Sequence, residues 1–184
     1  MQAPTGATPT PDSAKQPYFT LTDFIFVVIA IVVGILVVRL GATTWTEGMH
    51  TEATKANGEQ FAAWLEEAGT KRAAGEKIGV AACDADGASW AECRDALVAK
   101  DGPLASLANV ASPDSGVFAA ACDRAQLDTL GTIIIEKGLP KPPDGASLIY
   151  SAIPDAEPVK DALSLRVAVC GRGYSQINVR EVKF

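Results

Sequence analysis

The chain has 184 residues, of which 22 are acidic and 16 are basic, so its net charge is −6 at pH 7. This balance disfavours nucleic acid as a partner, because binding phosphate requires a basic surface. It also disfavours a polybasic attachment to anionic lipid. The residues after position 42 are numerous enough for one ordinary domain with its own core.

The N-terminal region has two parts with different compositions. Residues 1–17 contain four prolines among Thr, Ala and Ser, and this predicts a disordered tail with too little apolar surface to fold. Residues 24–38 read FIFVVIAIVVGILVV, without a charged or strongly polar side chain. An amphipathic helix of a soluble protein would show a polar face every three or four residues, and this stretch has none.

The apolar stretch predicts a transmembrane helix. Fifteen helical residues reach about 22 Å, short of a hydrocarbon core of roughly 30 Å, and apolar flanking residues supply the rest. We therefore expect a single span over 18–42, with the lipid bilayer as a partner. An uncleaved anchor is favoured over a signal peptide, because no Ala-x-Ala-like site follows and the apolar run exceeds an ordinary signal core.

Four cysteines follow the predicted span: Cys83, Cys93, Cys122 and Cys170. An even number on one side of a membrane indicates two disulfides in an oxidising compartment. Of the three pairings, Cys83–Cys93 with Cys122–Cys170 is favoured, because loops close more easily over short separations. A zinc site would need close pairs such as Cys-x-x-Cys, and none exists.

The cysteines also predict the topology. Lys15 precedes the apolar stretch 24–38 and Arg39 follows it, so the positive-inside rule hardly decides the orientation. The disulfides place the C-terminal domain outside the cytoplasm. We expect a single-pass protein of the inner (cytoplasmic) membrane.

Residues 43–75 predict a juxtamembrane helix. Phe61, Trp64, Leu65 and Ala68 follow the i, i+3, i+4, i+7 spacing of one buried face. Gly48 and Gly58 each weaken a helix, so a break near either is expected. Trp45 either extends the buried stripe or lies in the interfacial aromatic belt.

Residues 76–184 predict an α+β domain with helices and an antiparallel sheet, stabilised by the two disulfides. A short helix is expected over 90–100, and a proline-rich loop over 139–145. Alternating and β-branched runs predict five strands, over 117–121, 132–135, 147–153, 163–170 and 176–184. Residues 171–175 join the last two strands as a hairpin.

Motifs for chemistry are sparse in this sequence. Asp84, Asp86 and Glu92 lie in the predicted Cys83–Cys93 loop, where carboxylates could hold calcium, or form an ordinary acidic turn. His50 is the only histidine and is expected to be a solvated surface residue. No nucleophile elbow, phosphate-binding loop or His-Glu-x-x-His motif is present. We expect neither an enzyme nor, apart from calcium, a cofactor.

Asp23 is the most informative charged residue, because it lies at the entrance to the predicted span. It can cap the helix and meet the helix dipole. A functional role would require a partner such as an amine, a lysine of another subunit or a proton path. Gly34, within the span, would allow close approach of another helix.

Residues 19–28, FTLTDFIFVV, resemble the start of mature type IV pilins and pseudopilins, which begin Phe-Thr-Leu-x-Glu and continue as a Val/Ile/Ala helix. The resemblance implies a long helix, a loop with a disulfide, and an antiparallel sheet with a C-terminal disulfide. It also implies that Asp23 meets the amine of a neighbouring subunit during assembly. The chain has Tyr18 where the prepilin peptidase expects Gly, and Asp where the family has Glu.

Two alternatives compete with a pilin-like subunit. One is an accessory subunit of a larger inner-membrane complex, which requires only that the helix pack against partners. The other is a similarity to proton-driven stator subunits, in which Asp23 would carry the proton. The ectodomain argues against the stator, because it begins with a helix, carries four cysteines and lacks a peptidoglycan-binding signature. For a pilin-like subunit and for an accessory subunit, the expected partners are other membrane or pilus-type protein subunits.

Overall fold

The computed structural model describes residues 20–142, 147–159 and 162–184. The predicted tail over 1–17 lies outside the described residues. The chain divides into two compact units, Met1–Ala42 and Thr43–Phe184. Helix α1, Leu21–Ala73, begins in the first unit and ends in the second.

Helix α1 is continuous through both glycines at which a break was expected, so that expectation was wrong. Gly58 is buried against the sheet, where an added Cβ would lie 2.8 Å from a methyl group of Val169. The helix ends in a Schellman motif: Gly75 has φ +75° and donates to the carbonyl of Arg72, and Glu76 donates to that of Lys71. The close approach of Val169, rather than a break in the helix, explains why position 58 is a glycine.

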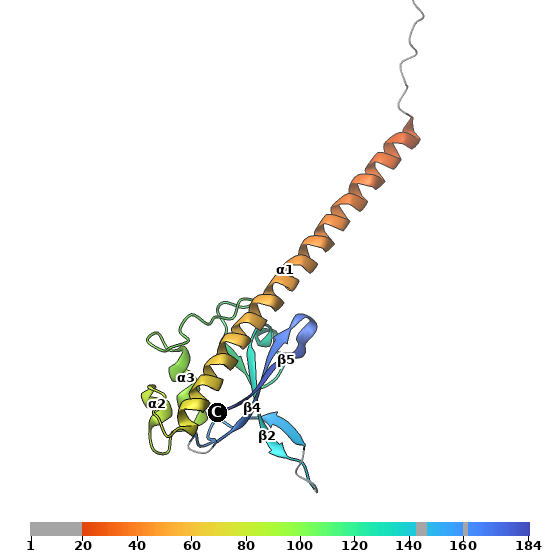
Figure 1. The fold of residues 1–184 in the computed structure, drawn as a ribbon. Helices are drawn as coiled ribbons and strands as arrows, with labels where there is room; N and C mark the ends of the chain where they lie inside the picture. Colours follow the sequence, from red (N-terminus) through yellow and green to blue (C-terminus); the bar gives the residue numbers. More distant parts are fainter. Residues whose placement is uncertain (1–19, 143–146, 160–161) are drawn as a thin grey trace, which may run out of the picture. The chain divides into compact units, whose positions relative to one another are not determined.

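The remaining elements of the second unit are short helices and strands, shown with α1 in Figure 1. They are α2 Ala81–Asp84, α3 Trp90–Val98, β1 Phe118–Ala119, a 3₁₀ turn Leu127–Thr129, β2 Ile133–Pro140, β3 Leu148–Ala152, β4 Ser164–Gly171, a second 3₁₀ turn Arg172–Tyr174 and β5 Ser175–Lys183. The fold of this unit is α+β, as the sequence predicted. Each predicted strand overlaps an observed one.

The five strands form a mixed sheet in the order β1-β2-β4-β5, with β3 also paired to β2. The antiparallel sheet that was expected is corrected at β1, which runs parallel to β2. β2 is longer than predicted, because Leu139 and Pro140 pair with β3 in the part expected to be a loop. Glu136 and Lys137 each pair with β3 on one edge of β2 and with β4 on the other. β1 also pairs with β2, so β1 and β3 share the edge of β2 that lies opposite β4.

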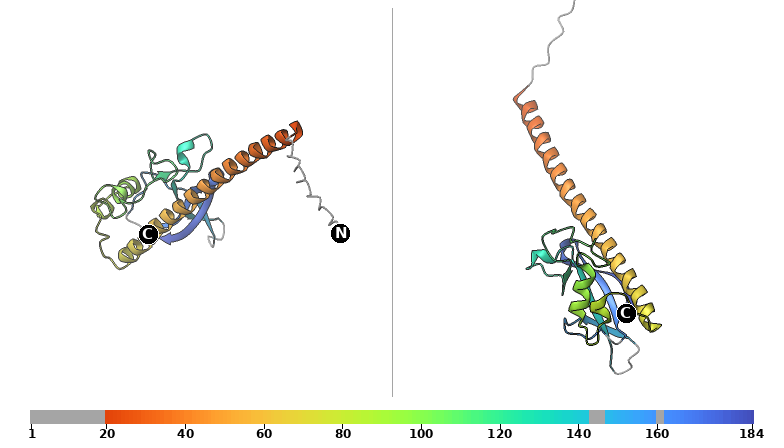
Figure 2. Two further views of the ribbon diagram at one scale, coloured as in Figure 1. Left: turned by 90° about the horizontal axis from the view of Figure 1, so that it is seen from above. Right: turned by 90° about the vertical axis from the view of Figure 1, so that its left-hand side faces the viewer.

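A main hydrophobic core holds the second unit together. The C-terminal part of α1 and helix α3 lie on one face of the sheet (Figures 1 and 2). Phe61 and Leu65 of α1 are fully buried, as the helical spacing predicted, and Trp64 packs at the margin. Trp90 of α3 meets the ring of Phe184 at 6.0 Å. Burying each such side chain contributes about 1.5–3 kcal/mol, so these contacts fix α1 and α3 on the sheet.

Candidate functional site

The first candidate is the apolar part of α1 within the first unit. In this unit the structure describes residues 20–42, and all of them are exposed. An 18-residue window has a mean hydropathy of 3.0, so this helix is long and apolar enough to cross a membrane. An added Cβ at Gly34 would meet nothing within 4 Å. The helix therefore presents an apolar surface around its circumference, with Gly34 open to an approaching partner.

Asp23 lies at the N-terminus of this helix and takes part in a reciprocal cap with Thr20. The Asp23 Oδ2 atom accepts hydrogen bonds from the Thr20 backbone N–H at 2.9 Å and the Thr20 hydroxyl at 2.7 Å. The Asp23 N–H donates to the Thr20 hydroxyl oxygen at 3.2 Å. This is a capping-box arrangement with Asp in place of Glu. Within the single chain, Asp23 thus has the capping role that was one of its expected functions.

The Cys83–Cys93 disulfide joins α2 to α3, with its Cα atoms 4.5 Å apart. Its acidic neighbours have separate structural tasks. The two carboxylate oxygens of Asp84 accept the N–H groups of Ile78 and Gly79, each at 2.9 Å. Glu92 is instead part of a capping box at the start of α3.

The Glu92 carboxylate accepts hydrogen bonds from the Ser89 N–H at 3.1 Å and the Ser89 hydroxyl at 2.8 Å. The backbone hydrogen bond from Ser89, followed by the hydroxyl, lowers the pKa of Glu92 from its usual 4.5. Among the described residues, no group of three His, Cys, Asp or Glu side chains could hold a metal ion. The structure thus does not bring Asp84, Asp86 and Glu92 together as a calcium site.

The Cys122–Cys170 disulfide ties the loop after β1 to the end of β4, with its Cα atoms 5.4 Å apart. Both disulfides therefore have the pairing that the sequence favoured. The loop covers a small second core made by Ile134, Ala168 and Cys170, against which Tyr174 packs. Tyr174 has φ +58°, a left-handed conformation that is uncommon for a residue with a side chain.

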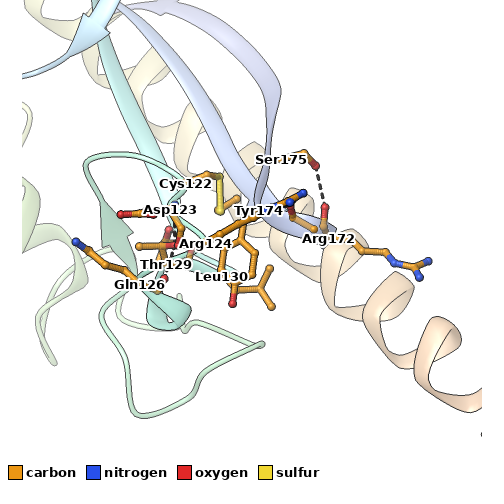
Figure 3. The surroundings of a disulfide bond; sticks show 12 residues. Cys122, Asp123, Arg124, Gln126, Thr129, Leu130, Arg172, Tyr174 and Ser175 are labelled. Carbon is orange, nitrogen blue, oxygen red and sulfur yellow. Dashed lines mark hydrogen bonds between the residues drawn. A yellow bond between two sulfur atoms is a disulfide. The ribbon is translucent and has the colours of Figure 1, made fainter.

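The loop and the β4–β5 turn are held together by further contacts. Figure 3 shows the Arg124 and Tyr174 side chains gathered beside the disulfide. The Arg124 guanidinium donates two hydrogen bonds of 3.1 Å to the carbonyl of Gly173. The Ser175 hydroxyl donates to the carbonyl of Arg172 at 2.9 Å. These contacts support the turn that carries the strained Tyr174.

His50 is exposed, as expected, and lines a pocket of about 300 Å³ with residues of the β4–β5 turn. Glu47, also in this lining, forms an ion pair of 2.7 Å with Arg172. Both partners are about half exposed, so this pair contributes little to stability.

A further pocket, of about 400 Å³, was not predicted from the sequence. It lies between α3 and β1, and Trp90, Arg94 and Phe118 are part of its lining. These residues come from segments that the sequence analysis treated as separate elements. The periodicity of the sequence does not predict that α3 and β1 are neighbours, because this contact depends on the parallel pairing of β1 with β2.

No protein-family model, curated protein or solved structure matches this chain.

Proposed function

We propose that this protein is a single-pass, membrane-anchored structural or assembly subunit of a larger complex. The observation that carries this proposal is the contrast along α1. Its N-terminal part is apolar and exposed, and its C-terminal part is buried on a sheet. A helix surface without a polar face is stable only against lipid tails or other helices. For this role, the N-terminal part of α1 needs only its apolar surface.

Two features support a location at the inner membrane with the folded unit outside the cytoplasm. Trp45 follows the apolar segment closely, and 73% of its surface is exposed. Tryptophan at this place suits the membrane–water interface, where its ring and its N–H group are both accommodated. The two disulfides suit an oxidising compartment.

Within this class, a type IV pilin-like or pseudopilin subunit is the leading form. Three features support it: the FTLTD start, a long helix whose C-terminal part packs on a sheet, and a disulfide that closes a loop onto the last strand pair. In this form, Asp23 meets the amine of a neighbouring subunit, and Gly34 allows helices to approach closely.

An accessory subunit of an inner-membrane complex is the second form. Tyr18, in the position of the peptidase's glycine, favours it, because an unprocessed chain has no free amine at Phe19. The helix then packs against partner helices without the registration role of Asp23.

Mass spectrometry of the protein purified from its native membrane distinguishes the two forms. A mature N-terminus at Phe19 supports the pilin-like subunit, and an intact N-terminus supports the accessory subunit. The class itself is tested by washing the membranes with carbonate. Release of the protein into the supernatant would contradict an inserted anchor.

A further inference from the structure

The edge strand β1 lies between two pockets that share its residues. A pocket of about 400 Å³ is on the α3 side, where Ile135 also lines it. A second pocket, of about 320 Å³, includes Thr132 in its lining. Thr132 directly precedes β2, and its carbonyl still pairs with Cys170 at the end of β4. Because Thr132 and Ile135 have opposite parity along this segment, the two pockets lie on opposite faces of the sheet. Gly116, Phe118, Ala119 and Ala120 line both.

The outer edge of β1 is available for another strand. The carbonyl of Val117 accepts a hydrogen bond of 2.8 Å from the N–H of Ile133, so it faces β2. Backbone groups of successive residues alternate between the two edges of a strand, and those of Phe118 therefore face away from β2. Among the described residues, no backbone hydrogen bond satisfies these outward groups. Such an edge is a template for strand pairing.

The charges around the two pockets select a basic occupant. Asp95 and Asp155 line the larger pocket, and Asp123 and Asp128 line the smaller one. The only base in either lining is Arg94, which pairs with Asp95 at 2.9 Å and Asp155 at 3.0 Å. The two linings together have a net charge of −3. Cationic side chains would complement this charge.

We propose that β1 is a docking site at which an extended, basic segment of a partner protein adds to the sheet as a further strand. The outward N–H and C=O groups of Phe118 hydrogen-bond to its backbone. Its side chains alternate between the two pockets, where lysine or arginine meets the acidic groups. This inference does not rest on the proposed membrane role, because every residue that carries it belongs to the second unit.

Peptide binding to the full chain in lipid nanodiscs tests the proposal. The probe is a fluorescein-labelled octapeptide with the repeated sequence Lys-Lys-Val-Val, which places lysines on both faces of an added strand, followed by fluorescence anisotropy. A peptide with glutamate in place of lysine tests charge. A peptide with D-lysine in place of L-lysine keeps the charge but disfavours the backbone conformation of an L-strand. We expect binding of the first peptide and binding at least about tenfold weaker for the other two. The glutamate peptide loses the attraction to the carboxylates, and the D-lysine peptide loses backbone hydrogen bonds, two of which amount to about tenfold.

Variants of the chain locate the site. Ala120→Pro places a rigid ring directly after β1, in the lining of both pockets, and we expect it to weaken binding about tenfold. Asp128→Asn should weaken binding about threefold. Asp101→Asn is the matched control, because Asp101 is exposed and lines neither pocket. Circular dichroism checks the fold of Ala120→Pro, and Asp128→Asn remains decisive if that variant misfolds.

Three results would overturn the proposal. One is equal binding of the L- and D-lysine peptides, which would indicate attraction by charge alone. Another is wild-type affinity in Asp128→Asn together with a folded Ala120→Pro. The third is an absence of peptide binding with self-association of the wild-type chain that Ala120→Pro abolishes, since the occupant would then be a second copy.

Discussion

Asp23 and Glu92 have the same structural task at the starts of two different helices. Each accepts the backbone N–H and the hydroxyl of the Thr or Ser three residues earlier. A Ser-x-x-Glu pattern before a helix is a readable capping signal. From the sequence, Glu92 was grouped with Asp84 and Asp86 as either an acidic turn or a calcium site, and its spacing from Ser89 was not used.

The pKa of Glu92 gives a pH-dependent prediction at this residue. Because its pKa is lowered in the folded state, its contribution to stability is complete above the usual value of 4.5 and is lost as pH falls through the lowered pKa. We expect Glu92→Ala to lower the thermal midpoint at pH 7 and to have less effect at acid pH. Thermal unfolding of both proteins across this range measures the difference.

Ser89→Ala provides the matching test by NMR titration. It removes the hydroxyl that donates to Glu92 while retaining the backbone N–H, so the pKa of Glu92 should rise toward its usual value. An unchanged pKa would mean that the hydroxyl does not stabilise the carboxylate.

Asp23→Asn tests whether the cap is the whole role of Asp23. An amide oxygen still accepts hydrogen bonds from Thr20, so the cost in helix stability should be well below about 1 kcal/mol. In a pilin-like subunit, the neutral side chain should block assembly while leaving insertion normal. A proton carrier would instead assemble and lose only energy-coupled work.

Membrane recovery, complex formation and energy-coupled work of the Asp23→Asn protein are the measurements. Normal complex formation and normal work would leave capping as the sole role of Asp23. That result would also remove the strongest residue-level reason for the pilin-like form.

At the scale of elements, the glycines of α1 separate into two kinds. An added Cβ at Gly48 would meet nothing within 4 Å. An added Cβ at Gly69 would collide with the backbone carbonyl of Lys183 at the end of β5. The helical periodicity identifies the buried face, but it cannot reveal which glycine lies against another backbone.

These two glycines form a matched pair for substitution by alanine. Gly48→Ala should stabilise α1 by about 0.5–1 kcal/mol, the difference in helix propensity. Gly69→Ala gains the same propensity but displaces backbone, so we expect a net loss of roughly 1–2 kcal/mol. Denaturant unfolding of the full chain in detergent measures both. A stabilising Gly69→Ala would contradict the close approach of α1 to β5.

The sequence predicted the existence of the strands better than their pairing. Alternation locates β4 and β5, because Leu165, Val167 and Val169 of β4 and Val182 of β5 are alternate residues that face the main core. Alternation could not predict the parallel pairing of β1, because only two residues form it. It also could not predict that β2 extends through Pro140. Proline is permitted there because the end of β2 pairs on one side only, with β3.

For the whole molecule, the two disulfides stabilise the second unit to different extents. Their sequence separations are 10 and 48 residues. The loop-closure model assigns about 3 kcal/mol to Cys83–Cys93 and about 4 kcal/mol to Cys122–Cys170. We therefore expect Cys170→Ser to reduce the free energy of unfolding more than Cys93→Ser.

Labelling of free thiols in the denatured, unreduced protein tests the premise of that prediction. No reactive thiol is expected in the wild-type chain and one in each variant. Four reactive thiols in the wild-type chain would show that the disulfides do not form. The proposal that this unit lies outside the cytoplasm would then lose its main support.

In the proposed role as a membrane anchor, insertion depends on the apolar segment of α1, and Ala30 lies near the middle of that segment. Arginine at the centre of a spanning helix costs about 3 kcal/mol of insertion free energy, so Ala30→Arg should reduce recovery in carbonate-washed membranes. Ala56→Arg is the control, because Ala56 is an exposed position of the same helix in the second unit. It makes the same chemical change beyond the predicted span and should leave recovery unchanged. Equal recovery of the two variants would mean that the apolar part of α1 is covered by protein rather than by lipid.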